Sequence, residues 1–171
     1  MSKIENDYDE EQESKLPSAE EVLMNEDDML RGLLEAANFK NDKGNYKKIQ
    51  VVRNKKLLFE FRIRPLEEEE IHDCRKRATK YIKNPAGKNL PKVEGDTDYC
   101  LYRSFKIYTA TIEEDKPKIW DNPKLKSQLG ALTPTDIIDQ ILLAGEKDWI
   151  CDVIDELSGY GDISREEYAK N

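Results

Sequence analysis

Apolar and polar side chains alternate between residues 57 and 64, with the two-residue period of a half-buried strand. Another apolar pair, Ile49 and Val51, lies just before the turn-like stretch 53–56, so the pattern predicts a β-hairpin over the two segments. Pro65 is expected to end the hairpin, because proline cannot donate to a strand ladder. The face that we expect to be buried carries Leu57, Phe59, Phe61 and Ile63.

After the hairpin the pattern predicts a helix from about Leu66 to Ile82. Negative charge at Glu67 to Glu70 suits the start of a helix, and the basic residues that follow suit its end. A polar linker is expected to follow the break at 84–87, up to about Gly95. Asp98 could then cap a further helix, whose apolar stripe would consist of Leu101, Tyr102, Phe105, Tyr108 and Ile112.

The last third of the chain carries clear start and stop signals for short helices. Asn122-Pro123 predicts a helix start and Gly130 its end. Thr133-Pro134 predicts a second helix that Gly145 is expected to end, and a third helix runs up to Gly159. We expect the last two helices to form an αα-hairpin. Their stripes would consist of Ile137, Ile138, Ile141 and Leu142, and of Trp149, Ile150, Val153, Ile154 and Leu157.

These elements predict an α+β fold: a mostly helical single domain with one β-hairpin packed on a C-terminal helical subdomain. We expect the domain at 41–161 and a C-terminal tail at 162–171. Residues 1–17 hold many acids and few large apolar side chains, so we expect a disordered acidic arm there. Residues 18–40 predict a docking helix that begins with a capping box at Ser18 and is interrupted near Asn25. Its stripe would consist of Val22, Leu23, Met29, Leu30, Leu33 and Leu34.

Charge is abundant and unevenly distributed along the chain. Charged residues make up 37% of the sequence, against about 25% in an average globular chain. Residues 1–28 hold eleven Asp and Glu against two Lys, a net −9, whereas residues 40–88 hold fifteen Lys and Arg against seven acids, a net +8. Residues 89–171 hold ten against seventeen, a net −7. This distribution suits charge-complementary docking with a partner or with further copies of the chain.

The cysteines and the N-terminus indicate a soluble protein that stays in the cell. Cys74, Cys100 and Cys151 lie far apart without CxxC spacing, so we expect three reduced thiols in the cytosol. The acidic N-terminus has neither the positive charge nor the apolar run of a signal peptide. No apolar stretch approaches the roughly 18–20 residues of a membrane span, so we expect no membrane association.

Residues that could suggest catalysis or metal binding have simpler explanations. His72, the only histidine, and Cys74 match no zinc-site spacing, which favours an ordinary helix residue. Glu67 to Glu70 point in different directions on a helix, so they would not converge on Mg²⁺. The sequence contains no phosphate-loop, dinucleotide-binding or hydrolase motif. We therefore expect no cofactor, no metal and no enzymatic activity.

The basic hairpin leaves two hypotheses open. A platform for nucleic acid would combine its cations with the aromatic rings of Phe59 and Phe61. Both rings, however, fall on the face that should be buried, which leaves a basic outer face without stacking groups. Binding to acidic protein surface, including neighbouring copies, is therefore favoured over nucleic acid. The basic residues are Lys47, Lys48, Arg53, Lys55, Lys56, Arg62 and Arg64.

From Phe59 to Tyr160 the order of motifs resembles the XkdN-like tail assembly chaperones of tailed phages and phage-tail-like particles. The first 45 residues are longer and more acidic than is typical of that family, and Ala144 stands where a proline is common. The matching strings are Phe61-Arg62-Ile63-Arg64-Pro65, Arg75-Lys76-Arg77-Ala78-Thr79-Lys80, Asp96-Thr97-Asp98-Tyr99, Thr109-Ala110-Thr111, Asn122-Pro123-Lys124-Leu125, Leu142-Leu143-Ala144-Gly145-Glu146 and Leu157-Ser158-Gly159-Tyr160.

The resemblance implies a transient scaffold in the cytoplasm of the bacterial host. Such chaperones bind the tape measure protein, promote polymerisation of the tail tube protein around it and are absent from the finished particle. We expect the same partners here, together with self-association into oligomers; the alternative is a small nucleic-acid-binding regulator that uses the basic hairpin. The residues that we expect to contact partners are Lys55, Lys56, Arg62, Arg64, Ile137, Ile141, Trp149 and Val153.

Overall fold

The computed structural model of the 171-residue chain describes residues 19–42 and 44–161, and of residues 19–24 only the backbone. The chain divides into two compact units, residues 1–42 and 43–171. The expected disordered acidic arm at 1–17, the capping box at Ser18 and the tail at 162–171 lie outside the described residues.

The first unit contains helix α1, Ala19–Asn41. The helix runs without a break through Asn25, so the predicted interruption there is wrong. A single asparagine costs a helix only a few tenths of a kcal/mol relative to alanine, which is too little to break one of this length. Every side chain from Asn25 to Asn41 is exposed, including the apolar ones.

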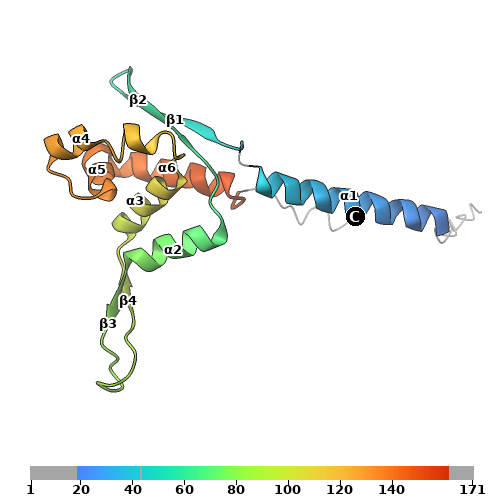
Figure 1. The fold of residues 1–171 in the computed structure, drawn as a ribbon, viewed down its shortest axis with the longest axis horizontal. Coiled ribbons are helices and arrows are strands. Elements are labelled where there is room, and N and C mark those ends of the chain that lie inside the picture. Colours follow the sequence, from blue (N-terminus) through green and yellow to red (C-terminus); the bar gives the residue numbers. More distant parts are fainter. Residues whose placement is uncertain (1–18, 43, 162–171) are drawn as a thin grey trace, which may run out of the picture. The chain divides into compact units, whose positions relative to one another are not determined.

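The second unit is mostly helical and holds two separate two-stranded antiparallel sheets, which confirms the predicted α+β class and adds a second hairpin (Figure 1). Its strands are β1 (Lys47–Arg53), β2 (Lys56–Ile63), β3 (Thr79–Ile82) and β4 (Val93–Thr97). Its helices are α2 (Glu68–Ala78), α3 (Tyr99–Ala110), the short 3₁₀ helix η1 (Lys116–Lys118), α4 (Pro123–Leu129), α5 (Pro134–Ile141) and α6 (Ala144–Leu157).

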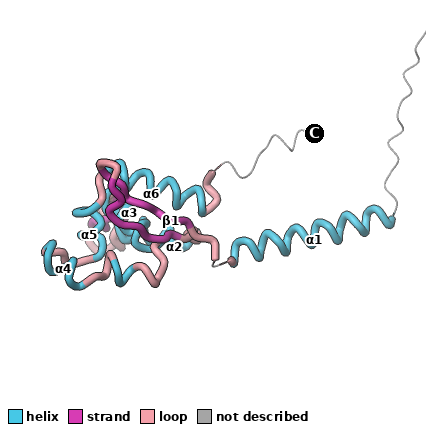
Figure 2. The backbone as a smooth tube through the Cα atoms, turned by 90° about the horizontal axis from the view of Figure 1, so that it is seen from above, coloured by secondary structure: helices cyan, strands magenta, loops and turns pink. Residues whose placement is uncertain are grey.

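The core forms where the β1–β2 hairpin lies across the helices (Figure 2). Ile49, Val51, Phe61 and Ile63 turn inward from the hairpin, as the alternation predicted for Phe61 and Ile63. The segment after α3 extends the hairpin, because Arg64 N donates to Ala110 O at 2.8 Å and Ile112 N donates to Arg62 O at 3.1 Å. From the helices the core receives Leu66, Ile107, Ala110, Trp120, Ala131, Ile137, Ile138, Leu142, Ile150, Cys151 and Ile154.

Trp120, whose burial the sequence pattern did not reveal, lies in the middle of this core. Its side chain is fully buried and lies edge-on to Phe59 and Phe61, with ring centroids 6.2 and 5.3 Å away. The indole Nε1 donates a hydrogen bond to Thr111 Oγ1 at 2.9 Å, so the buried polar atom is satisfied.

The predicted helix from Leu66 to Ile82 is wrong at its C-terminal end. Helix α2 ends at Ala78, and residues 79–82 form strand β3 against β4. Thr79, Tyr81 and Ile82 are β-branched or aromatic and favour extended backbone, and pairing with β4 supplies the hydrogen bonds that a continued helix would have made. Part of the expected polar linker is therefore strand β4.

Two details of the helical region also differ from prediction. Helix α3 ends at Ala110, and its most buried face carries Ser104, Ile107 and Ala110, whereas Leu101 and Phe105 are only half-buried. Gly145 does not end α5; that helix ends at Ile141, and Gly145 lies in the first turn of α6. The predicted start signals hold: the side chains of Asp98, Asn122 and Thr133 each accept a backbone hydrogen bond at the start of a helix.

Candidate partner-binding surfaces

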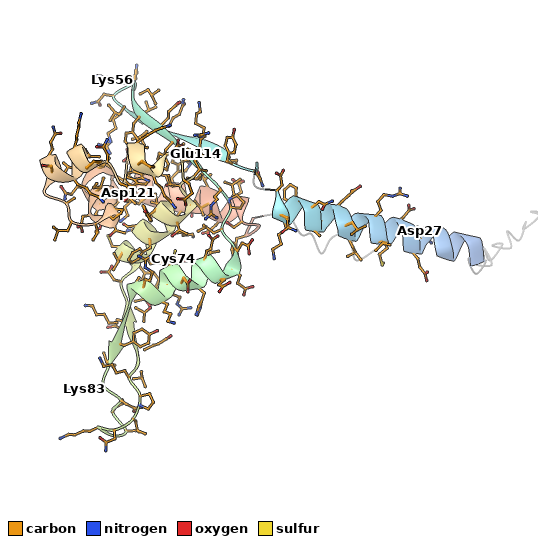
Figure 3. All side chains as sticks on the ribbon, viewed as in Figure 1. Asp27, Lys56, Cys74, Lys83, Glu114 and Asp121 are labelled. Carbon is orange, nitrogen blue, oxygen red and sulfur yellow. The ribbon has the colours of Figure 1, made fainter. Side chains whose placement is uncertain are left out.

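The turn of the β1–β2 hairpin presents two lysines and three apolar side chains together. Asn54 and Lys55 have φ of 51° and 62°, the left-handed backbone of a two-residue hairpin turn. Lys55 and Lys56 are exposed, and neither forms an ion pair within the described residues (Figure 3). The apolar neighbours are Val52 (52% exposed), Leu57 (47%) and Leu58 (46%). We call these five residues the hairpin tip.

The expected burial of Leu57 is wrong. Between Val51 and Val52 the strand register shifts by an irregularity, after which Val52 opposes Leu57. A β-bulge of this kind leaves one residue unpaired and turns the strand, so the inward-facing alternation of Phe61 and Ile63 does not extend to the end of the hairpin. The consecutive pair Leu57-Leu58 was a signal of exposure, because neighbouring strand residues point to opposite faces.

Arg62 forms an ion pair with a carboxylate of the same chain. Its guanidinium binds Asp115 through two nitrogens, Nε at 3.1 Å and Nη2 at 2.8 Å, and its backbone N donates to the same carboxylate at 2.9 Å. The Asp115 side chain is 9% exposed, and the hydrogen bonds from Arg62 hold its pKa below the ordinary value. Such a two-pronged pair is the strongest geometry for Arg and a carboxylate.

The other arginines of the hairpin are paired in the same way. Arg64 binds Glu70 of α2 through both Nη atoms, at 2.9 and 2.7 Å. Arg53 binds Glu146 of α6 at 2.9 and 2.7 Å and also donates to Ile141 O at 2.6 Å. These hydrogen bonds lower the pKa of Glu70 and of Glu146. The three arginines thus form ion pairs that link the β1–β2 hairpin to α2, to α6 and to the segment after α3.

Two lysines of the hairpin also have acidic partners, at exposed positions. Lys47 Nζ lies 3.2 Å from Glu156 and Lys48 Nζ lies 3.1 Å from Glu60. Of the seven basic residues that the sequence placed on this hairpin, only Lys55 and Lys56 are free of such pairs within the described residues. The aromatic rings that could have stacked on bases face Trp120.

The predicted contact residues on α5 and α6 differ in accessibility. Ile137 is fully buried, whereas Ile141 and Val153 are half-buried against the core. Trp149 is 49% exposed. Together with Val153, it lines a shallow surface hollow that continues over Asp152, Asp155, Glu156, Tyr160 and Gly161.

Two further accessible surfaces are present, and only one of them was predicted from the sequence. One is the β3–β4 hairpin, which extends away from the helices at the ends of α2 and α3 (Figure 1) and exposes Tyr81, Ile82 and Leu90. The other is the apolar face of α1, which the sequence predicted as a docking helix. The only signal for the first was the density of lysines in a stretch that was expected to be linker.

The thiols differ in exposure, and Lys147 Nζ lies 3.3 Å from Sγ of the exposed Cys100. Cys74 and Cys151 are buried, and burial raises the pKa of Cys151 to about 11. Cys100 and His72 are exposed. Within the described residues no group of three His, Cys, Asp or Glu side chains could hold a metal ion. None of the helices in this part of the chain is long and apolar enough to cross a membrane.

The second unit is a small α+β domain with exposed apolar and basic projections. A model of the phage XkdN-like tail assembly chaperone proteins matches residues 30–170, and the chain belongs to this family. The predicted resemblance is thereby confirmed. Searches of curated proteins and of solved structures found no match.

Proposed function

We propose that this chain binds the tape measure protein in the cytoplasm of the bacterial host, promotes assembly of the tail tube protein around it, and is absent from the mature particle. The family membership supports a role in tail assembly. The single structural observation that carries the proposal of a direct contact is the hairpin tip, where three half-exposed apolar residues flank the two unpaired lysines along the strands.

The chemistry of the tip fits a long helical partner. Isolated amphipathic helices expose apolar stripes that aggregate unless they are covered, and their polar faces commonly carry acids. Val52, Leu57 and Leu58 would cover part of a stripe, and Lys55 and Lys56 would pair with acids beside it. One such contact is weak, but many copies along one partner bind strongly together.

The other predicted contact residues divide by accessibility. Trp149, with Val153 beside it, offers a second apolar contact at the surface hollow on α6, and Ile141 is a half-buried residue at the end of α5. In this proposal Arg62, Arg64 and Ile137 act indirectly, by holding the hairpin and α5 in place.

The test is co-expression with the tape measure protein encoded in the same gene cluster. We expect the wild-type chain to raise the soluble yield of that protein and to co-elute with it on gel filtration. The double variant Leu57→Ser/Leu58→Ser should lose most of this effect, because it removes the apolar half of the hairpin tip while keeping both lysines.

The matched control is Leu132→Ser/Leu143→Ser, which changes two leucines that are 88% and 58% exposed outside the tip. It should behave as wild type. Circular dichroism should show that both variants are folded. The proposal is wrong if the wild-type chain neither solubilises the tape measure protein nor forms a complex with it, and the tip is the wrong surface if both variants lose the effect equally.

The alternative of a nucleic-acid-binding regulator gains no support from the β1–β2 hairpin. Five of its seven cations are held by carboxylates of the same chain, and its aromatic rings contact Trp120. Phosphate binding there would require breaking pairs that fix the fold.

A further inference from the structure

The last turn of α2 and the β3–β4 hairpin together carry a long run of unpaired positive charge. Residues 75–92 contain seven Lys and Arg and no Asp or Glu. None of the seven forms an ion pair with another described residue, in contrast to the arginines of the β1–β2 hairpin. Arg75, Lys76 and Arg77 lie on α2, whereas Lys80, Lys83, Lys88 and Lys92 lie on the hairpin, where β4 also carries Glu94 and Asp96.

Apolar side chains lie among these cations. Tyr81, Ile82 and Leu90 are 42%, 51% and 50% exposed. A two-stranded hairpin with no third strand is at best marginally stable in water, and the β3–β4 pair forms a sheet of its own. An apolar partner laid on this hairpin would therefore stabilise it as well as bind it.

Helix α1 has the complementary surface. Met29, Leu30, Leu33 and Leu34 recur at helical spacing on one face, and each is between 56% and 69% exposed. Of the six acids in the helix, Glu26 lies three and four residues before Met29 and Leu30, so it falls within the same stripe. A purely apolar partner would bury that carboxylate unpaired, which costs free energy, whereas a partner that mixes apolar and basic side chains would satisfy it.

The same acids argue against pairing of α1 with another α1. In a parallel, in-register pair of α1 helices, Glu26, Asp27 and Glu35 would face identical carboxylates, and like charges at close range repel, whereas Asp28 is paired with Arg31 of its own helix. In the described residues, the hairpin tip and the β3–β4 hairpin both offer lysines beside exposed apolar side chains (Figure 3, around Lys56 and Lys83), and the β3–β4 hairpin has four unpaired lysines against two at the tip.

We infer that the β3–β4 hairpin is a docking surface for helix α1 of a second copy of this chain. Because each copy has one helix and one hairpin, two copies can exchange the contact reciprocally, as a twofold dimer requires. The two contacts then act together, which strengthens an association that either alone would make only weakly. The inference concerns contacts between copies and does not depend on the identity of the tail proteins that they bind.

The first test locates the contact and shows which copies make it. Equal amounts of full-length ¹⁴N and ¹⁵N chains are mixed and treated with a carbodiimide, which joins a carboxylate to a lysine amine. We expect cross-links from Glu26, Asp27 or Asp28 to Lys80, Lys83 or Lys88, with about half of the linked peptide pairs containing one ¹⁴N and one ¹⁵N member. Linked pairs of one isotope only would mean that the helix binds its own chain, and the inference would fail.

The second test exchanges the charges. Lys83→Glu/Lys88→Glu and Glu26→Lys/Asp27→Lys should each weaken dimerisation about tenfold or more in sedimentation equilibrium, and the chain carrying all four changes should recover most of the loss. The control Lys124→Glu reverses an exposed lysine outside both hairpins and should dimerise as wild type.

Two results would overturn the inference. One is a chain that stays monomeric up to about 100 μM at low salt, and the other is a fourfold variant that dimerises more weakly than either double variant. Failure of tape measure binding would leave it standing, since neither test involves that protein.

Discussion

Arg62 shows how much of this fold depends on single side chains. It binds Asp115 through its guanidinium and its backbone N, while its backbone O accepts from Ile112 N. The guanidinium also lies over the ring of Tyr46, 5.7 Å from its centroid. One residue thus connects the start of β1, strand β2 and the segment after α3, which explains why a charge on the outward face of a strand is part of the structure.

The carboxylates bound by these arginines predict how stability depends on pH. The pKa values of Asp115, Glu70 and Glu146 are lower in the folded chain than in an unfolded one, mainly because of hydrogen bonds from Arg62, Arg64 and Arg53. A lowered pKa gives stability that is fully present above the unfolded value, near pH 4, and is lost as pH falls through the folded value. We expect the free energy of unfolding to be level above about pH 5 and to fall steeply below pH 4.

Urea denaturation between pH 2.5 and 6 measures this. Asp115→Asn should cost about 1–3 kcal/mol at pH 6, because it weakens a buried pair, and should flatten part of the acid slope. The control is Glu94→Gln, because Glu94 is exposed and forms no ion pair with another described residue. This variant should follow the wild-type curve. A slope unchanged by Asp115→Asn would contradict the role given to Asp115.

At the scale of elements, boundaries depend on backbone geometry more than on composition. Gly130 follows α4 with φ of 63°, a left-handed conformation in which a Cβ is strained. Gly145 was predicted to play the same part, but it lies within the first turn of α6, without a positive φ. Leu142 and Leu143 make the bend instead, both with extended backbone.

This difference predicts opposite effects of one substitution. Gly130→Ala should lower the free energy of unfolding by about 1 kcal/mol, because alanine disfavours the left-handed region. Gly145→Ala should raise it by about 0.5 kcal/mol, because it reduces the freedom of the unfolded chain, and an added Cβ meets nothing within 4 Å at either glycine. Thermal unfolding of the two variants measures both, and destabilisation by Gly145→Ala would mean that it is a helix stop after all.

At the scale of the whole molecule, the basic middle of the sequence separates into two different surfaces. The cations of the β1–β2 hairpin are mostly paired within the fold, whereas those at residues 75–92 are unpaired. The positive charge available to partners is therefore concentrated on the β3–β4 hairpin and the hairpin tip. Acidic partners, including the N-terminal part of another copy, fit this distribution.

The overall charge of −8 predicts that nucleic acid is not among these partners. At about 150 mM salt, affinity for a random DNA duplex should be no tighter than ordinary non-specific binding, about 10⁻⁴–10⁻⁶ M. Lys55→Glu/Lys56→Glu should leave that value unchanged while it weakens binding of the tape measure protein. Fluorescence anisotropy at several salt concentrations measures the affinity, and sub-micromolar binding would support the nucleic-acid alternative.

The sequence alone determined the features that depend on neighbouring residues. Caps at Asp98, Asn122 and Thr133, the hairpin around Asn54 and the inward alternation of Phe61 and Ile63 follow from local backbone chemistry and a short period, so they could be predicted together with the α+β class. The order of motifs along the chain also indicated the family.

Only the tertiary structure decided which residues remain accessible. Strand β3 forms because β4 pairs with it, Trp120 is buried because two segments close over it, and Arg53, Arg62 and Arg64 are neutralised by acids 93, 53 and 6 positions away. Sequence periodicity cannot reveal such partners, because pairing and burial depend on distances in space that chain closure sets. The same physical reason made Leu57 look buried, and left Lys55, Lys56 and the lysines of the β3–β4 hairpin without ion pairs among the described residues.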